Sequence, residues 1–480
     1  MSVPRAALLS LATTIVTAAT AFAQEAPAGS LPQERNTPAT ASPAVAPGAG
    51  AREAREGETS IKSGDSTRTL ALEEALRALD GQSLTLAQAR ARAEEAAGLT
   101  RQALSAALPT VTAAGSYTRN SDAVRAPIGS LLRQLNPNAP ATPDLIIQPL
   151  EAFSASGTVR VPLLAPSAWA DFAAARSAQT AAGASAEAVR LQTRAALVQA
   201  AWAAGAGEEI VTASERAVRS ADEQVRLAER ALAAGTGVPL SVLQARTELV
   251  KRQSDLARAR ADLGRAQLAL GVLLGRAEPL RIPLAPAEPP ATVDARALAE
   301  EAVGRRPEVR AAAGQEQAAG RQLTSARLRL LPQLSTSASA FAQDVALPSG
   351  KNEGWKLTVD LTWQLYDGGL RYGRARQAEG AIAGARAAAE AQRVEVVQQV
   401  QDAARDVAVA AERLKLAQDQ VKLAGEAAGT ARRGFAAGIS SSLDVLDAND
   451  RLYQSEVGLA DASARLGIAL ATLDRATGRG

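Results

Sequence analysis

Two stretches in each half of the chain alternate strictly between apolar and polar residues. In the clearest of them, Leu357, Val359 and Leu361 are separated by single polar residues. A period of two puts apolar side chains on one face of a β-strand and polar side chains on the other. The predicted strand pairs are 110–119 with 152–164 and 333–343 with 355–366.

Long stretches between the strands follow another period, with apolar residues seven positions apart. Such residues are Val211, Val218, Val225 and Leu232 in the first half and Val445, Leu452, Leu459 and Leu466 in the second. A sustained seven-residue repeat predicts helices that supercoil against neighbouring helices. The stretch from 167 to 234 alone would extend roughly 100 Å, at about 1.5 Å per residue.

The long helices break at a segment that the chain contains twice. Ala231–Leu249 and Arg432–Tyr453 align when Gly235 is placed on Gly438. Glycine ends helices because it adopts the left-handed conformation without a Cβ clash. The duplication predicts two repeats, each with a helix, a strand pair and a long helical hairpin. These repeats are 81–282 and 283–480, with hairpin tips near 235–241 and 435–444.

The first residues have the features of an export signal. Arg5 precedes an apolar stretch that is too short to span a bilayer, and Ala21-Phe22-Ala23 matches a signal-peptidase site. We therefore expect a signal peptide at 1–23 and a Pro- and Ala-rich, disordered periplasmic tether at 24–80, with room for one short helix at 69–79. Because the chain has no Cys, no lipid anchor is expected at the mature N-terminus.

Composition narrows the chemistry further. The 480 residues include no Cys and no His, which removes thiol chemistry, Cys/His zinc sites and imidazole-dependent triads. The net charge of +3 comes from interspersed acids and bases, which favours solvated helix surfaces over a nucleic-acid footprint. We therefore expect no enzymatic activity, no cofactor, no metal site and no nucleic-acid partner.

The chain is expected to be exported, and it combines strand pairs that have one apolar face with long helices. This combination favours strands that cross the outer membrane in a barrel and helices that lie in the periplasm. The four predicted strands are too few, because about eight strands are the smallest number that encloses side chains. The chain is therefore expected to oligomerise.

Four motifs in this duplicated frame resemble those of the TolC-like outer membrane efflux family. They are LTLAQA at 84–89, LLPQLS at 330–335, WQLYDGGLRYGRARQA at 363–378 and FAAGISSSLDVLDANDRLY at 435–453. The resemblance spans 85–478 and implies a mainly α fold with a β-barrel part. Duplicated helical hairpins would form a periplasmic α-barrel, and a homotrimer would pool four strands per chain into a twelve-stranded outer-membrane β-barrel.

The resemblance also implies a function, the passive exit duct of a tripartite efflux or type I secretion system. The implied partners are a periplasmic adaptor (membrane fusion) protein, an inner-membrane transporter of the RND, ABC or MFS type, and outer-membrane lipid. Drugs, metal ions and secreted proteins all remain compatible cargoes. Two alternatives are a periplasmic coiled-coil scaffold or stalk, which would need no amphipathic strands, and an enzyme built on an isolated Asp/Glu pair.

Asp444 and Asp447 match the paired aspartates that this family carries at its pore constriction. They lie three residues apart at the start of a helix and therefore share one face. In a trimer they would form two carboxylate rings that favour cations, and close like charges would raise their pKa values. The alternative is local: Asp444 complements the helix dipole and Asp447 pairs with Arg451.

The two tips resemble the region that meets the adaptor in this family. The residues expected at this contact are Gly235, Ser241, Phe435, Gly438 and Ser440. At the positions of Phe435 and Ser440, well-studied family members carry a tyrosine and an arginine that help to lock the tip shut. At the position of Ser241, an aspartate can occur. A polar lock of the usual kind is therefore not expected here. For the two glycines, simple helix termination is the alternative.

Three tryptophans also carry predictions. Trp355 and Trp363 are expected at the membrane–water interface, with ordinary packing as the alternative. Trp202, within an Ala-rich helix, is expected to pack between helices. Asp367-Gly368-Gly369 is expected to form a strand-to-helix corner.

Overall fold

The computed structural model describes residues 68–138, 145–290, 293–344 and 351–479, which fall into two compact units. Within these residues, the strand unit comprises Leu108–Ala165 and Gln333–Thr362. The helical unit comprises the remaining described residues. The expected signal peptide at 1–23, and the expected tether as far as residue 67, lie outside the described residues.

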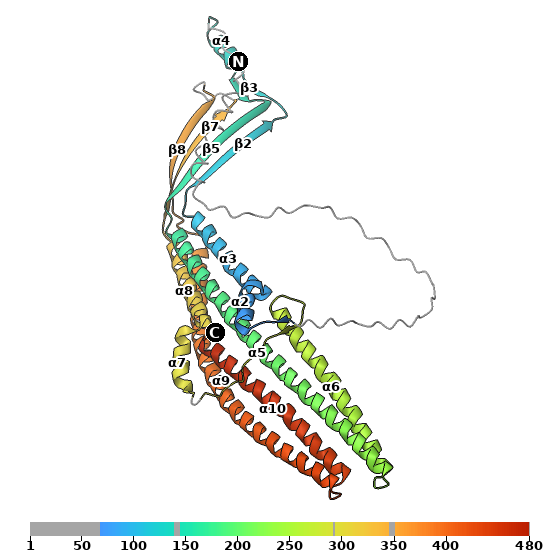
Figure 1. The fold of residues 1–480 in the computed structure, drawn as a ribbon. Helices are drawn as coiled ribbons and strands as arrows, with labels where there is room; N and C mark the ends of the chain where they lie inside the picture. Colours follow the sequence, from blue (N-terminus) through green and yellow to red (C-terminus); the bar gives the residue numbers. More distant parts are fainter. Residues whose placement is uncertain (1–67, 139–144, 291–292, 345–350, 480) are drawn as a thin grey trace, which may run out of the picture. The chain divides into compact units, whose positions relative to one another are not determined.

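The strand unit is built on one antiparallel sheet of four strands in the order β2-β5-β7-β8 (Figure 1). Its long strands are β2 (Thr110–Arg119), β5 (Glu151–Leu164), β7 (Gln333–Gln343) and β8 (Glu353–Thr362). The pairing of β5 with β7 joins strands from the two halves of the chain. The two halves therefore share a single sheet.

The loop between β2 and β5 is longer than its counterpart and contains secondary structure of its own. It holds β3 (Val124–Ala126), α4 (Ile128–Leu135) and β4 (Leu145–Gln148). The two short strands pair with each other and do not join the main sheet. The sequence pattern predicted only an irregular loop here, because three- and four-residue strands are too short to show a period.

The main sheet has one apolar and one polar face. Directly paired residues lie on the same face, so each cross-strand row can be read from the register. One row across all four strands is Val111, Val159, Ala338 and Leu357. The adjacent row, on the opposite face, is Thr112, Thr158, Ser339 and Lys356.

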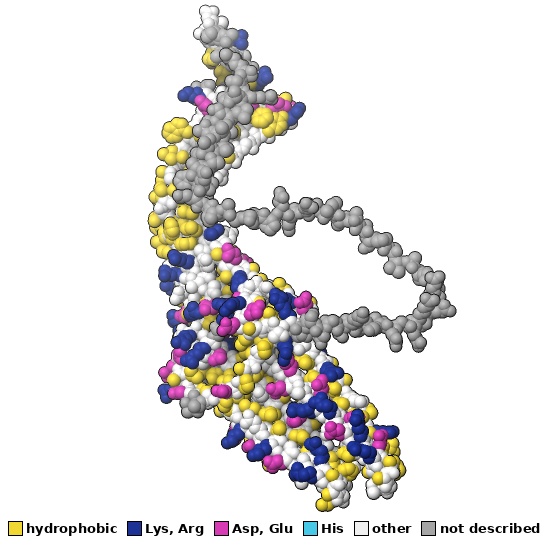
Figure 2. All heavy atoms as spheres, viewed as in Figure 1, with side chains coloured by type: hydrophobic (Ala, Val, Ile, Leu, Met, Phe, Trp, Pro, Cys, Tyr) yellow, Lys and Arg dark blue, Asp and Glu magenta, His cyan; other side chains and the backbone are white. Residues whose placement is uncertain are grey.

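The apolar face is exposed in the single chain. On β8 the residues Trp355, Leu357, Val359 and Leu361 are between 62% and 78% exposed. Figure 2 shows apolar side chains gathered over the strands. A soluble protein rarely leaves so large a contiguous apolar surface open, so this face requires a non-aqueous or protein partner.

The predicted strand 355–366 differs from β8, which begins at Glu353 and ends at Thr362. Beyond Thr362 the chain leaves the ladder, and the Trp363 indole donates to the carbonyl of Leu330 at 3.1 Å. Gly368 and Gly369 then take φ values of +68° and +90°, which a strand does not accommodate. Alternation continues through Leu365, but these glycines end the extended segment.

The helical unit contains two long hairpins and a group of shorter elements (Figure 1). The hairpins are α5 (Pro166–Ala233) with α6 (Pro239–Leu273) and α9 (Leu370–Ala436) with α10 (Ser442–Thr477). The shorter elements are β1 (Arg68–Thr69), α2 (Leu72–Gln82), α3 (Leu84–Ser105), β6 (Leu280–Arg281), α7 (Ala295–Arg305) and α8 (Pro307–Leu328). Among the described residues, no helix is both long enough and apolar enough to cross a membrane.

The disorder expected for 24–80 is wrong for the last of these residues, where the short helix allowed at 69–79 is present as α2. β1 pairs in parallel with β6, and α2 buries Ala75 and Leu79 completely. These side chains pack in a cluster with Leu197, Leu280 and Ile282. The order of this segment therefore depends on contacts some 200 residues away, which the local Ala- and Glu-rich sequence does not reveal.

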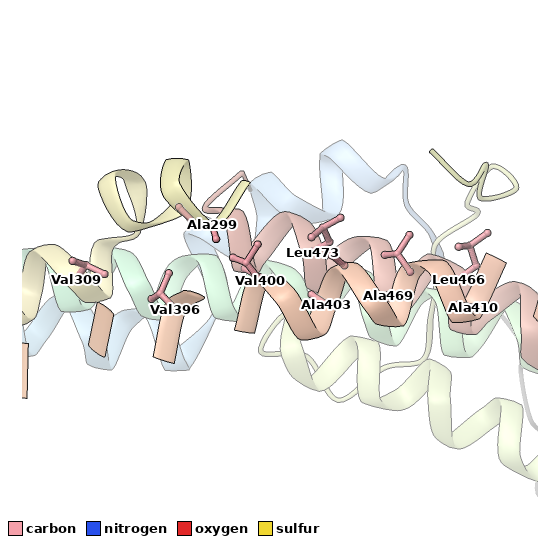
Figure 3. Packing of buried hydrophobic residues seen from close by; sticks show 13 residues of the cluster. Ala299, Val309, Val396, Val400, Ala403, Ala410, Leu466, Ala469 and Leu473 are labelled. Carbon is pink, nitrogen blue, oxygen red and sulfur yellow. The ribbon is translucent and has the colours of Figure 1, made fainter. Parts of the chain in front are cut away.

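Small and branched side chains form the main core of the helical unit. Ala299 of α7, Val309 of α8, Val400 of α9 and Leu473 of α10 belong to one buried cluster (Figure 3). A second cluster near the hairpin tips joins α5 to α6 through Val225, Ala228, Val242 and Ala245. Alanine at so many core positions lets the helix axes approach closely.

Candidate functional site

The turn between α9 and α10 is closed by backbone hydrogen bonds around one glycine. Gly438 has a φ of +75°, and the next residue, Ile439, donates its N–H to the carbonyl of Gly434 at 2.8 Å. Ser440 donates to the same carbonyl at 3.2 Å. This arrangement satisfies the free carbonyls at the end of α9, as left-handed helix caps do.

Asp444 forms a capping box with Ser441 at the start of α10. The Ser441 hydroxyl accepts from the Asp444 N–H at 3.2 Å, and the Asp444 carboxylate accepts from the Ser441 N–H at 2.7 Å. The Ser441 hydroxyl also donates to this carboxylate at 2.7 Å. Hydrogen bonds from the Ser441 side chain and then its backbone hold the pKa of Asp444 below its usual range. The rise in this pKa expected from like charges in a trimer stays a prediction, because in one chain the carboxylate has only its local donors.

Asp447 pairs with Arg451 one turn further along α10, at 2.9 Å between the side chains. Both side chains are more than half exposed, so the pair itself adds little stability. They border a groove of about 550 Å³ between α9 and α10, which Leu416 and Leu423 also line. Both contacts of the local alternative are thus present in one chain. The predicted ring in an assembly stays a prediction.

The first tip uses different chemistry at its second helix. Gly235 has a φ of +76°, and Thr236 and Gly237 both donate to the carbonyl of Ala231. α6 then begins at Pro239, with no side-chain cap at Val238, and Ser241 lies in its first turn. The tip is therefore a duplicated turn in which a proline start replaces the Ser–Asp box.

Phe435 and Ser440 lie at the second tip without a polar link to the first. Phe435 is in the last turn of α9 and is half-buried, and Ser440 packs against Gly434. The Phe435 side chain has no hydrogen-bonding group, and among the described residues the Ser440 side chain makes no hydrogen bond to the α5–α6 hairpin. The absence of the usual polar lock stays a prediction, because the assembled tip is needed to test it.

Sequence reasoning missed the most buried charged group near the tips. The Arg252 side chain, on α6, is only 5% exposed. Its guanidinium contacts Asp450 on α10 and lies 2.6 Å from Glu248 and 3.4 Å from Asp255 on its own helix. It also stacks over the ring of Tyr453, 4.6 Å from the ring centre. We name Arg252, Asp450 and Tyr453 the arginine cluster.

A sequence signal for Arg252 was present. Val242, Leu249 and Leu256 hold one seven-residue register along α6, and the companion register is Ala245, Arg252 and Ala259. Ala245 and Ala259 are buried, so a charged residue between them has to lie inward as well. An inward arginine in a helix seam requires acidic partners.

The arginine cluster is well paired. Lys251 adds a second cation 3.2 Å from the Asp450 carboxylate. Burial raises the pKa of Asp450, but hydrogen bonds and charge from Arg252 and Lys251 outweigh burial and hold this pKa below its usual range. The Tyr453 hydroxyl lies 3.1 Å from the Ser214 hydroxyl of α5. Three helices therefore meet at this point.

The remaining predicted residues lie on the sheet, at the start of α9 and within α5. Trp355 stands on the apolar face of the sheet, 78% exposed. Asp367 accepts from the backbone of Gly369 and Arg371 and from the Arg371 side chain, so this segment caps α9. Trp202 covers Gly467 of α10 so closely that a Cβ there would overlap the indole. This contact agrees with the packing role predicted for Trp202.

Comparison with known proteins gives the same architecture. The chain is 22% identical to the outer membrane protein VceC from Vibrio cholerae, with a TM-score of 0.70 over 85% of this chain and 96% of VceC. It is 17% identical to the CmeC outer membrane channel of Campylobacter jejuni, with a TM-score of 0.72 over 85% of this chain and 86% of CmeC. At these identities the likeness concerns the fold.

Sequence comparison adds the family. Outer membrane protein OprJ of Pseudomonas aeruginosa is 27% identical over 218 residues, which is 44% of this chain and 46% of OprJ, so the match spans about half the length of that relative. The model of the family described as outer membrane efflux protein matches residues 75–276 and 298–479, well over half of the 480 residues. This chain belongs to the outer membrane efflux protein family.

Proposed function

We propose that the protein is the exit duct of a tripartite efflux or type I secretion system, and that it conducts its cargo passively through the outer membrane. The observation that carries this proposal is the sheet, whose apolar face leaves the large side chains of β8 and Val111, Phe153 and Val159 exposed, while the opposite face is polar. In a membrane barrel the apolar face meets lipid and the polar face lines water. Family membership supports the same reading.

The two outer strands of the sheet support a trimer. Among the described strands, β2 and β8 each have a ladder partner on one side only. Backbone groups at an open edge need partners inside a bilayer, and a closed ring of strands supplies them. Three chains would give twelve strands, which exceeds the roughly eight needed to enclose a lumen.

Within this duct, Asp444 and Asp447 form the periplasmic constriction and favour cations. The capping box and the Asp447–Arg451 pair leave both aspartates exposed at the tip, which supports this placement. A neighbouring chain would bring like charges close to them, and this would oppose the lowered pKa seen for Asp444 in one chain.

The two turns are the docking site for a periplasmic adaptor, and the adaptor links the duct to an inner-membrane transporter of the RND, ABC or MFS type. Gly235, Ser241, Phe435, Gly438 and Ser440 form this surface. The duplicated left-handed glycine turns support it, because both expose backbone and carry no Cβ. Trp355 and Trp363 mark the lipid interface, and their exposure supports that role.

A scaffold or stalk would contain the same helices, but it gives no reason for the amphipathic sheet. Two measurements test the duct. Cell fractionation should recover the protein in the outer membrane, and native mass spectrometry of the detergent-solubilised protein should give three chains per particle. Recovery from the soluble periplasm, or a stable monomer with full helix content, would contradict the proposal.

A further inference from the structure

The two hairpins of the helical unit are joined near their tips by a buried charge. Arg252 on α6 contacts Asp450 on α10, and its side chain is only 5% exposed. The other charged contacts between the hairpins in this part of the described chain have more exposed cations. Lys251 of α6, 54% exposed, also lies 3.2 Å from Asp450. Arg216 and Glu456 are 3.5 Å apart, with the arginine 55% exposed. Buried, charge-assisted contacts are much stronger than solvated ones.

Arg252 also has partners that would stay with it if α10 moved. Glu248 precedes it by one turn and Asp255 follows by three residues, and both lie on α6. Asp450 likewise accepts from Gln454 on its own helix at 2.6 Å. Separation of the hairpins therefore leaves neither charge bare, which removes the large penalty that normally follows the breaking of a buried pair. Such a contact can exist in two states.

The position of this contact connects it to the proposed constriction. Asp450 follows Asp447 by three residues and Asp444 by six, all within the first turns of α10. A displacement of α10 from α6 at Asp450 would carry both aspartates with it. A cavity of about 230 Å³ lies beside the contact, lined by Gln224 of α5 and Arg432 of α9 among others. This cavity gives the guanidinium room to change partners.

We propose that the arginine cluster is the latch that holds the duct closed in this protein, in place of a polar lock at Phe435 and Ser440. In the closed state Arg252 binds Asp450 and stacks on Tyr453. In the open state it keeps Glu248 and Asp255 while α10 moves away. The inference rests on the proposed duct function and names the contact that regulates it.

The test compares single-channel recordings of the purified full-length protein in planar bilayers. Asp450→Asn keeps the size of the side chain and removes its charge. This change weakens the hydrogen bonds that Asp450 accepts from both Arg252 and Lys251, and it should raise the ratio of open to closed time at least about tenfold. Arg252→Lys keeps the positive charge but loses the forked geometry and the stacking, and it should shift the ratio in the same direction.

Arg246→Gln is the matched control. Arg246 is also on α6 and lies 2.6 Å from Glu229, but Glu229 is on α5, so this ion pair stays within one hairpin. Its loss should leave the open-to-closed ratio at the wild-type value. Asp450→Glu retains the negative charge, so this variant should keep most of the closed time that Asp450→Asn loses. A purely structural network would lower thermal stability in the variants without changing this ratio.

The outcomes separate the latch from the duct. If both the wild-type protein and Asp450→Asn insert and neither gives conductance, the duct proposal fails and the latch fails with it. If the wild type conducts but Asp450→Asn and Arg252→Lys open no more often than Arg246→Gln, the latch alone is overturned. If Asp450→Asn does not assemble, Arg252→Lys decides by the same comparison.

Discussion

The contact between Trp202 and Gly467 predicts that one substitution has opposite effects at two sites of the same helix. Gly467, on α10, has no room for a side chain: an added Cβ would lie far inside the 3.0 Å below which Cβ contacts essentially never occur, against the indole of Trp202. Gly458, nine residues earlier in the same helix, has nothing within 4 Å of the corresponding position. Gly458→Ala is therefore a matched control for Gly467→Ala.

The magnitudes follow from two opposing effects. Alanine in place of glycine inside a helix stabilises by about 0.5–1 kcal/mol, because the unfolded chain loses freedom. Overpacking a filled site costs about 1–3 kcal/mol. Gly458→Ala should therefore raise the free energy of unfolding and the thermal midpoint. Gly467→Ala should lower the free energy of unfolding by a net of about 1–2 kcal/mol, and its midpoint should fall.

Circular dichroism of the detergent-solubilised proteins, heated at one rate, measures both shifts. The double variant Trp202→Leu with Gly467→Ala tests the cause, since a smaller side chain on α5 leaves space for the new methyl group. Its midpoint should lie above that expected from adding the two single effects. Midpoints that move equally for Gly467→Ala and Gly458→Ala would refute the assigned packing between α5 and α10.

Three further predictions concern the hairpin of α9 and α10. Replacing Asp444 and Asp447 with Asn should reduce cation selectivity and block by multivalent cations in bilayer recordings while trimers still form, and unchanged selectivity would return both residues to local roles. The pKa of Asp444 is lower in the folded protein than its ordinary value of 3.8. The ionised Asp444 carboxylate therefore stabilises the fold above pH 3.8, and this stabilisation is lost as the pH falls through the lowered pKa of the folded state. Ser441→Ala should raise that pKa, as carboxyl NMR titration would show. Gly425 and Gly429 lie in the interior of α9, and an added Cβ meets no steric conflict at either position. Replacing either glycine with alanine should raise the free energy of unfolding by about 0.5–1 kcal/mol and raise the thermal midpoint, whereas a lower midpoint would indicate crowding in the assembly.

The sequence predicted those elements whose cause is local. β2 and β7 have the predicted bounds, because alternation is a property of neighbouring residues that one apolar and one polar face impose. The Asp447–Arg451 pair was predicted from its spacing of four residues. The Ser441–Asp444 box was not predicted, although its spacing of three residues at a helix start is an equally local signal.

What was missed depends on distant partners. The short helix allowed at 69–79 is present as α2, but nothing within 72–82 announces the contacts with Leu280 and Ile282 that hold this segment in the fold. Arg252 was overlooked because its own helix explains it as a surface residue with Glu248 and Asp255 nearby. Its place between Ala245 and Ala259 in a seven-residue register pointed inward, and its burial beside Asp450 of α10 establishes that position.

The central claim is that copies of this chain enclose a water-filled path through a membrane. Conductance of the purified wild-type protein in a planar bilayer tests this most directly. The account predicts discrete, uniform current steps that favour cations and that appear only after insertion. Protein that is demonstrably inserted in the bilayer, yet passes no current at any voltage or after the Asp450→Asn change, would contradict it.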